Sequence, residues 1–160
     1  EQLRRLRGEF YTAWLRQASD AVRAAGRCMQ VHVSERMAEP TWQTEMQIHF
    51  DWPRWFDEGL ADEVTVKMMS TVRHRAPAII AAARQAGLKV HFCPYLNSTH
   101  GKPFGPHKVR NAVDETLAAA ADGLILYENK EFMQADEQGA VQLRAPWLIE
   151  TLAARARQGG

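Results

Sequence analysis

Two carboxyl-bearing residues stand where predicted strands end. Glu35 follows the apolar stretch 28–34, and Glu128 ends the apolar stretch 123–128. Two carboxyl groups, one protonated as an acid and one ionised as a base or nucleophile, can act together in general acid–base catalysis. Glu128 is the first catalytic candidate because it directly ends a buried strand, and Glu35 is the second. The alternatives are a solvated charge within Glu128–Glu131 and a plain polar loop after Glu35.

Further side chains near predicted strand ends are suited to holding a polar substrate: Lys67, Tyr95, Asn97, His100 and Trp42. Lys67 ends the stretch 62–67, and the next three lie in the long connection 95–105, a length that is often functional. The ring of Trp42 can stack on a ligand or cover the core. A structurally paired lysine, and turn residues that bond to the backbone, are the other interpretations.

The histidines and cysteines do not indicate a metal site. His91 and Cys93 are two residues apart on one predicted strand, and His32 is distant in sequence, so no cluster has zinc-like spacing. A structural role is favoured for all three residues. Neither a dinucleotide fingerprint nor a P-loop occurs, and we expect no metal and no cofactor.

The elements that must position these residues alternate between helix and strand. Apolar spacings of three and four predict helices over 3–25 and 75–86, with others at 51–58 and after 106 and 146. The predicted strands are 28–34, 62–67, 88–94 and 123–128. Gly26 is expected to end the first helix as a left-handed cap, and Gly59 and Gly87 are expected to end the next two. Strands that recur every 28 to 36 residues predict parallel pairing with right-handed crossovers.

This order predicts one α/β domain over 1–160, with four parallel strands and flanking helices. An open doubly wound sheet has the same order of elements, but it usually carries a Gly-rich phosphate turn, which the sequence lacks. A TIM-type (β/α)₈ barrel is therefore favoured. A whole barrel needs eight strands and about 250 residues, so the chain corresponds to its carboxy-terminal half.

The segment Asp51–Asp62 reads Asp-Trp-Pro-Arg-Trp-Phe-Asp-Glu-Gly-Leu-Ala-Asp. It resembles the tryptophan-rich helix, Gly-Leu turn and Asp-led strand of glycoside-hydrolase-like family-ten domains, which are (β/α)₈ barrels. Phe10–Trp14, Gly87–Val90 and Ala121–Leu124 fit the same order of elements, so the resemblance spans most of the chain. It implies that the protein binds or cleaves a polysaccharide or oligosaccharide. The family's strand after Asp62 usually runs into Pro and Tyr, and Val64–Met68 departs from that pattern.

Two functions remain open. One is a glycoside hydrolase in which Glu128 and a second acid flank the scissile bond. The other is a non-catalytic half-barrel that binds a saccharide or a partner, and completes its ring with another chain or with an amino-terminal half. Closure by a second half-barrel, as a homodimer, would also cover strand edges that are otherwise unpaired.

Charge and hydropathy narrow the range of partners. Twenty Lys and Arg against 19 Asp and Glu give a formal net charge of +1, so no electrostatic footprint indicates a nucleic acid. No stretch approaches the roughly 20 apolar residues of a membrane span, and no signal peptide is recognisable. The chain begins with Glu1 rather than Met, which suits a processed or excised piece.

The cysteines and tryptophans are interpreted as structural. Cys28 and Cys93 are expected to be buried thiols on strands separated by a third strand, which is too far for a disulfide. Unbridged cysteines leave the compartment open. The remaining tryptophans lie on predicted helices and are expected to pack between helix and sheet: Trp14, Trp52, Trp55 and Trp147.

Overall fold

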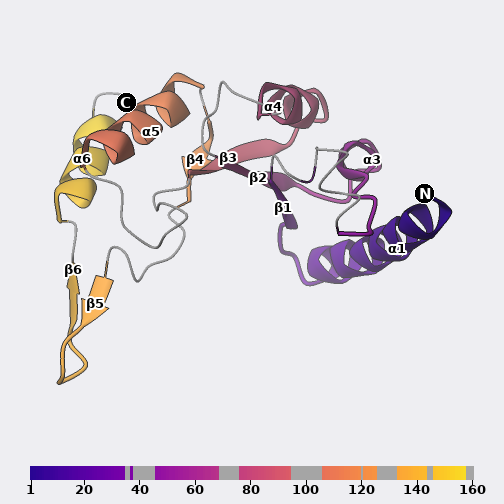
Figure 1. Cartoon of the computed structure of the whole chain (residues 1–160), viewed down its shortest axis with the longest axis horizontal. Coiled ribbons are helices and arrows are strands. Elements are labelled where there is room, and N and C mark those ends of the chain that lie inside the picture. Colours follow the sequence, from indigo (N-terminus) through magenta and orange to yellow (C-terminus); the bar gives the residue numbers. More distant parts are fainter. Residues whose placement is uncertain are drawn as a thin grey trace.

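The computed structural model describes residues 1–34, 37, 46–68, 76–94, 106–119, 121–125, 133–143 and 146–157. Its helices are α1 (Gln2–Ala24), α3 (Trp52–Asp57), α4 (Ala76–Gln85), α5 (Pro106–Ala118) and α6 (Pro146–Ala156). Its strands are β1 (Gln30–Ser34), β2 (Glu63–Met68), β3 (Lys89–Pro94), β4 (Gly123–Leu124), β5 (Met133–Ala135) and β6 (Val141–Leu143). Figure 1 shows α1 at one end of the main sheet and α5, α6 and the β5–β6 hairpin at the other.

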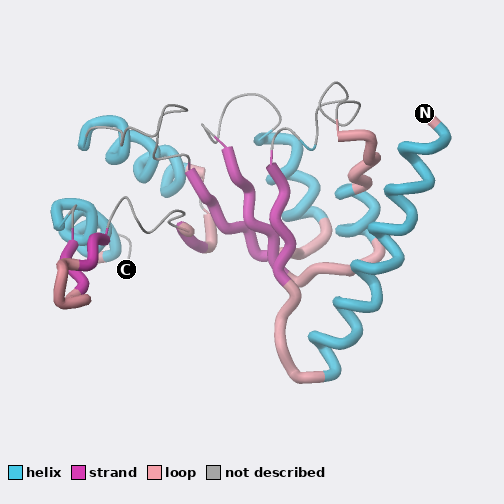
Figure 2. Tube along the Cα trace, turned by 60° about the horizontal axis from the view of Figure 1, so that its bottom comes forward, coloured by secondary structure: helices cyan, strands magenta, loops and turns pink. Residues whose placement is uncertain are grey.

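The main sheet has the order β1-β2-β3-β4, and all of its pairings are parallel. Its three longer strands run side by side in Figure 2. Gly26, Gly59 and Gly87 have φ angles of 66°, 65° and 77°, so each supplies the left-handed residue after a helix. The predicted α/β order and parallel pairing are therefore confirmed. A four-stranded parallel sheet flanked by helices is compatible with half of a (β/α)₈ barrel.

The apolar core lies on one face of this sheet. The core-facing strand residues are Val31, Val33, Val64, Val66, Val90 and Phe92, all buried. Trp55 and Phe56 of α3 and Ile79 of α4 belong to the same cluster. Because side chains alternate along a strand, the residues between them project from the opposite face, which is polar.

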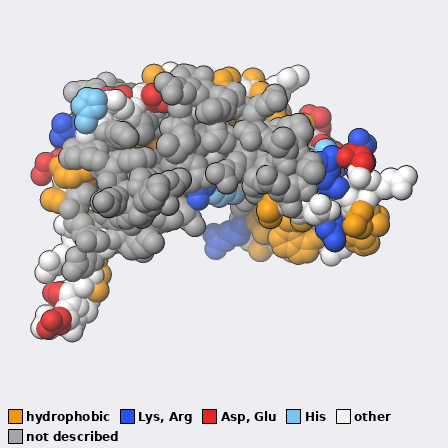
Figure 3. Space-filling model, viewed as in Figure 1, with side chains coloured by type: hydrophobic (Ala, Val, Ile, Leu, Met, Phe, Trp, Pro, Cys, Tyr) orange, Lys and Arg blue, Asp and Glu red, His pale blue; other side chains and the backbone are white. Residues whose placement is uncertain are grey.

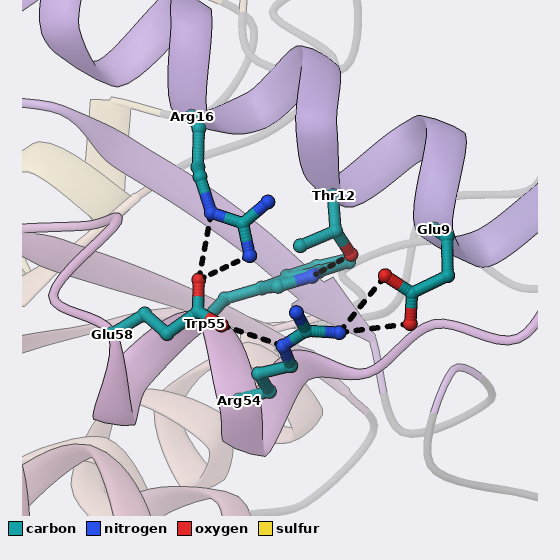
Figure 4. A network of polar contacts seen from close by, with 6 residues as sticks. All are labelled: Glu9, Thr12, Arg16, Arg54, Trp55 and Glu58. Carbon is teal, nitrogen blue, oxygen red and sulfur yellow. Dashed lines mark hydrogen bonds and ion pairs between the residues drawn. The ribbon is translucent and has the colours of Figure 1, made fainter.

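A buried hydrogen bond and two ion pairs join α1 to α3 and its C-cap residue Glu58, and a third ion pair lies within that segment (Figure 4). The indole Nε1 of Trp55 donates to the hydroxyl oxygen of Thr12 over 2.9 Å. Both groups are buried, so this bond satisfies two polar groups inside the core. The surrounding ion pairs are Arg54–Glu9 at 2.8 Å, Arg54–Glu58 at 2.6 Å and Arg16–Glu58 at 2.5 Å.

The large apolar residues whose spacing predicts helix α1 do not form its buried face. Its large apolar residues Leu3, Leu6, Phe10 and Trp14 are exposed, whereas Gly8, Thr12, Leu15 and Ser19 are buried. A small residue at Gly8 lets the backbone of His49 cross the helix closely, which the larger apolar residues would prevent. Trp14 therefore does not pack between helix and sheet. Trp55 does, and Trp52 packs partly buried against the core.

Two further features differ from expectation. Cys28 precedes β1 and is exposed, whereas Cys93 on β3 is buried as predicted; both are free thiols. The antiparallel hairpin of β5 and β6 was not predicted. Its turn carries a recognisable signal, because Asp136 Oδ1 accepts the backbone N–H of Ala140 at 2.8 Å and Gly139 has a φ of 82°.

Bilayer-spanning helices are absent from the part of the chain that the structure describes, since none of its helices is both long and apolar enough.

Candidate functional site

Three polar side chains form one row at the carboxyl ends of β1, β2 and β3. The parallel registers place Ser34 beside Lys67, and Lys67 beside Cys93. Neighbouring strands lie about 4.8 Å apart, so one ligand can reach the partly exposed Ser34 and Lys67, whereas Cys93 is buried beside Lys67. Barrels place their binding and catalytic groups at this end of the strands. We refer to Ser34, Lys67 and Cys93 as the strand-end row.

A second row lies one step below, where His32, Thr65 and His91 are neighbours on the same face. Thr65 is 3% exposed, and its hydroxyl oxygen has no hydrogen-bond partner among the described residues. A buried hydroxyl without a partner costs folding free energy, so it calls for an explanation such as a bound water, an ion or a functional role. The row therefore contains one hydrogen-bonding group whose presence the fold alone does not explain.

His91 is held in place from two sides. Its Nε2 lies 3.2 Å from Oε2 of Glu63 on β2. On β4, a Cβ at Gly123 would lie only 2.5 Å from Nδ1 of His91, so a glycine is needed for the ring to sit against this strand. The imidazole of His91 thus packs between a carboxylate and a backbone segment.

Glu63 closes the amino end of the polar face. Its carboxylate accepts a hydrogen bond from Nε2 of Gln30 at 3.0 Å and lies 3.8 Å from the ammonium of Lys89. The side chains of Gln30, Lys89 and His91 thus all lie at the one carboxylate of Glu63. Glu63 is therefore engaged in holding three strands together, and the opposite end of the face is the better place for a ligand.

Lys67 influences the charge state of both of its neighbours in space. Partial burial lowers the pKa of His32, and the charge of Lys67 lowers it further. Burial raises the pKa of the Cys93 thiol, and Lys67 opposes that effect. Near neutral pH the site therefore presents a neutral imidazole, a protonated thiol and the hydroxyl of Ser34 around one ammonium group. Such groups bind hydroxyls and oxyanions by hydrogen bonds.

The structure places the predicted residue Lys67 at the centre of the strand-end row. The other predicted site residues lie outside the described residues: Glu35, Trp42, Tyr95, Asn97, His100 and Glu128. His32 and Thr65 were missed as site residues. The regular alternation of polar and apolar residues along Gln30–Ser34 and Glu63–Lys67 is the signal that could have identified a polar face.

No group of three or more His, Cys, Asp or Glu side chains within the described ranges is arranged to hold a metal ion. His91 instead contacts Glu63. The described part of the polar face thus presents hydrogen-bonding groups that are not arranged as a set of metal ligands.

Comparison with known protein families, with curated proteins and with solved structures finds no match. The interpretation of the site therefore depends on its own geometry. That geometry consists of a four-stranded parallel sheet, a core on one face, and a polar face that ends in the strand-end row.

Proposed function

We propose that the chain is the carboxy-terminal half of a (β/α)₈ barrel and that it binds a saccharide at the carboxyl ends of its strands. The observation that supports this best is the strand-end row, in which Lys67 lies between Ser34 and Cys93 beside a neutral His32. Saccharides present hydroxyls that both donate and accept hydrogen bonds. The ammonium of Lys67 donates, and the hydroxyl and neutral imidazole do both.

We further propose that the saccharide is cleaved, with Glu128 as the general acid and Glu35 as the second carboxyl group. Glu35 directly follows Ser34, the last residue of β1, and Glu128 is the fourth residue after Leu124, the last residue of β4. This placement in the sequence, together with the resemblance of Asp51–Asp62 to glycoside-hydrolase-like domains, supports the assignment. Hydrolysis needs both carboxyl groups, one protonated and one ionised.

Binding is tested by isothermal titration calorimetry, in which the protein is titrated with each of a panel of neutral and acidic oligosaccharides. We expect Lys67→Met to weaken binding at least about tenfold, or about 1.4 kcal/mol. Lys89→Met is the matched control, because Lys89 projects from the same face at the opposite end and is 67% exposed. The proposal fails if no oligosaccharide binds, or if both variants weaken binding equally.

Catalysis is tested separately by the release of reducing ends from the oligosaccharides that bind. Glu128→Gln and Glu35→Gln preserve the size of each side chain but remove its ability to donate or accept a proton. We expect each to abolish turnover while the dissociation constant changes little. Turnover that is unchanged in Glu128→Gln excludes its catalytic role, and binding without turnover in the unaltered protein leaves a saccharide-binding module.

A further inference from the structure

The exposed large apolar side chains gather at the two open ends of the main sheet. At the first end, α1 carries Leu3, Leu6, Phe10 and Trp14, which are 54% to 70% exposed. Figure 3 shows hydrophobic side chains crowded over α1. At the second end, β5, β6 and α6 carry Met133, Val141, Leu143 and Ile149, which are 44% to 66% exposed. Within the described residues, the remaining large exposed apolar side chain is Met46, which is not on α1 but precedes Gln47, whose carbonyl accepts a hydrogen bond from Arg7 of that helix.

The apolar stripe of α1 continues along the helix as small, uncharged residues. At 100° per residue, Ala13, Gln17, Ala21 and Ala24 share the sector of the large apolar residues. All four are exposed. This sector lies opposite the buried face of Gly8, Thr12, Leu15 and Ser19. The helix thus buries one face and leaves an uncharged face open over its whole length. We call it the α1 face.

The β5–β6 hairpin also has an apolar face. Met133 pairs with Leu143, and Ala135 pairs with Val141, so the alternation of strand residues directs all four side chains to one side. Ile149 of the following helix α6 is exposed as well. We call these five residues the hairpin face. In Figure 1 the hairpin and α1 lie at opposite ends of the molecule.

The two edges of the main sheet are also open. Among the described residues, β1 pairs with β2 alone and β4 pairs with β3 alone. Open edges of a parallel sheet present backbone N–H and C=O groups that another strand can bind. Four parallel strands are half the number that closes a TIM-type ring.

We propose that two copies of this chain close one eight-stranded ring, with the α1 face of each copy packed on the hairpin face of the other and β1 beside the partner's β4. This inference rests on the half-barrel fold proposed above, and it does not depend on the ligand. A two-fold axis along the ring repeats the same seam twice, so one chain supplies both complementary surfaces.

The exposed apolar area agrees with a stable dimer. An aromatic side chain buries roughly 150 to 250 Å², so Phe10 and Trp14 at their observed exposures contribute a large part of the α1 face. With the aliphatic residues of both faces and two identical seams, closure removes on the order of 1,500 Å² from water, which is typical of a specific complex.

Light scattering after size exclusion, and sedimentation equilibrium, measure the association. We expect the unaltered chain to be a dimer. Phe10→Gln combined with Trp14→Gln should weaken it at least tenfold, as should Val141→Thr combined with Leu143→Thr. Met46→Gln, at an exposed apolar residue outside both faces, should leave it unchanged. Circular dichroism checks that each variant is folded, and the two pairs of substitutions test the proposal independently.

Mixing the two double variants distinguishes ring closure from other dimers. A mixed ring contains one seam in which both faces are altered and one seam in which both are intact, so the mixture should form a heterodimer although neither variant forms a homodimer. A dimer that pairs α1 with α1 would be insensitive to the hairpin variant and would overturn the proposal. A monomeric unaltered chain, or a mixture that stays monomeric, would also overturn it. Because no saccharide is present, these outcomes are independent of the binding test for Lys67.

Discussion

Asp62 and Met29 exchange two hydrogen bonds where β1 and β2 begin. The backbone N–H of Asp62 donates to the carbonyl of Met29 at 2.8 Å, and the N–H of Met29 donates to Oδ2 of Asp62 at 2.7 Å. Asp122 and Val90 make the same pair of bonds between β4 and β3, each at 2.8 Å. An aspartate before a strand thus fixes the register of two different strand pairs.

Replacement of Asp62 by Ala should lower the free energy of unfolding by about 1 to 2 kcal/mol, since it leaves the Met29 N–H unpaired and removes the ion pair with Arg23. The expected loss lies in the lower part of the free-energy range for hydrogen bonds to charged groups, because the Asp62 carboxylate is 36% exposed and is screened by solvent. Urea unfolding measures the change. Asp57→Ala, at an exposed carboxylate at the end of α3, is the control and should have little effect.

The contribution of Asp62 should also depend on pH. The ion pair with Arg23, and then the N–H of Met29, hold the pKa of Asp62 below its usual value of 3.8. The folded state therefore favours the ionised form, and the stabilisation is complete well above pH 3.8 and is lost as the pH falls through the lower folded pKa. Urea unfolding of the unaltered chain and Asp62→Ala should differ most near neutral pH and least in acid. A difference that grows in acid would contradict this sign.

The parts of the fold that were predicted correctly depend on local signals. Gly26, Gly59 and Gly87 mark helix ends because a left-handed residue is needed there, and the apolar stretches at 28–34 and 62–67 mark the strands β1 and β2. The packing of Trp14 was mispredicted because its apolar row and the row from Gly8 to Ser19 both follow helical spacing. The close approach of the backbone at Gly8 selects the row with the smaller residues. At the site, Lys67 was identified by its strand-end position, but its alignment with Cys93 depends on strand register, which sequence spacing does not specify.

Removal of each of two buried hydroxyls on α1 should affect the stability of the protein differently. Thr12 accepts the Trp55 indole N–H, so Thr12→Val leaves that buried donor unpaired and should cost about 1 to 3 kcal/mol. The hydroxyl of Ser19 is buried and has no partner in the described part of the chain, so Ser19→Ala should be neutral or stabilising. Chemical denaturation followed by circular dichroism compares them. Equal losses in the two variants would mean that the bond to Trp55 contributes nothing specific.

Gly8→Ala should destabilise the protein although alanine is the better helix former. An added Cβ would lie 2.2 Å from the backbone carbonyl oxygen of His49, so the segment that crosses α1 must move. We expect a net loss of about 1 to 3 kcal/mol, in the range for overpacked sites, despite a gain of about 1 kcal/mol in helix propensity. Gln17→Ala on the exposed face is the control. A higher melting temperature for Gly8→Ala would show that the backbone of His49 does not lie close against α1.

The two thiols should differ in reactivity. Cys28 is exposed, whereas Cys93 is buried and its pKa is raised by that burial, which leaves less of the reactive thiolate. A colourimetric thiol reagent should therefore modify one cysteine quickly in the native protein and the second only after denaturation. Cys28→Ser should remove the fast reaction, and Cys93→Ser should retain it. If Cys93 reacts as fast as Cys28, then the strand-end row is open to solvent at Cys93, and its thiol is available to a ligand that binds Lys67.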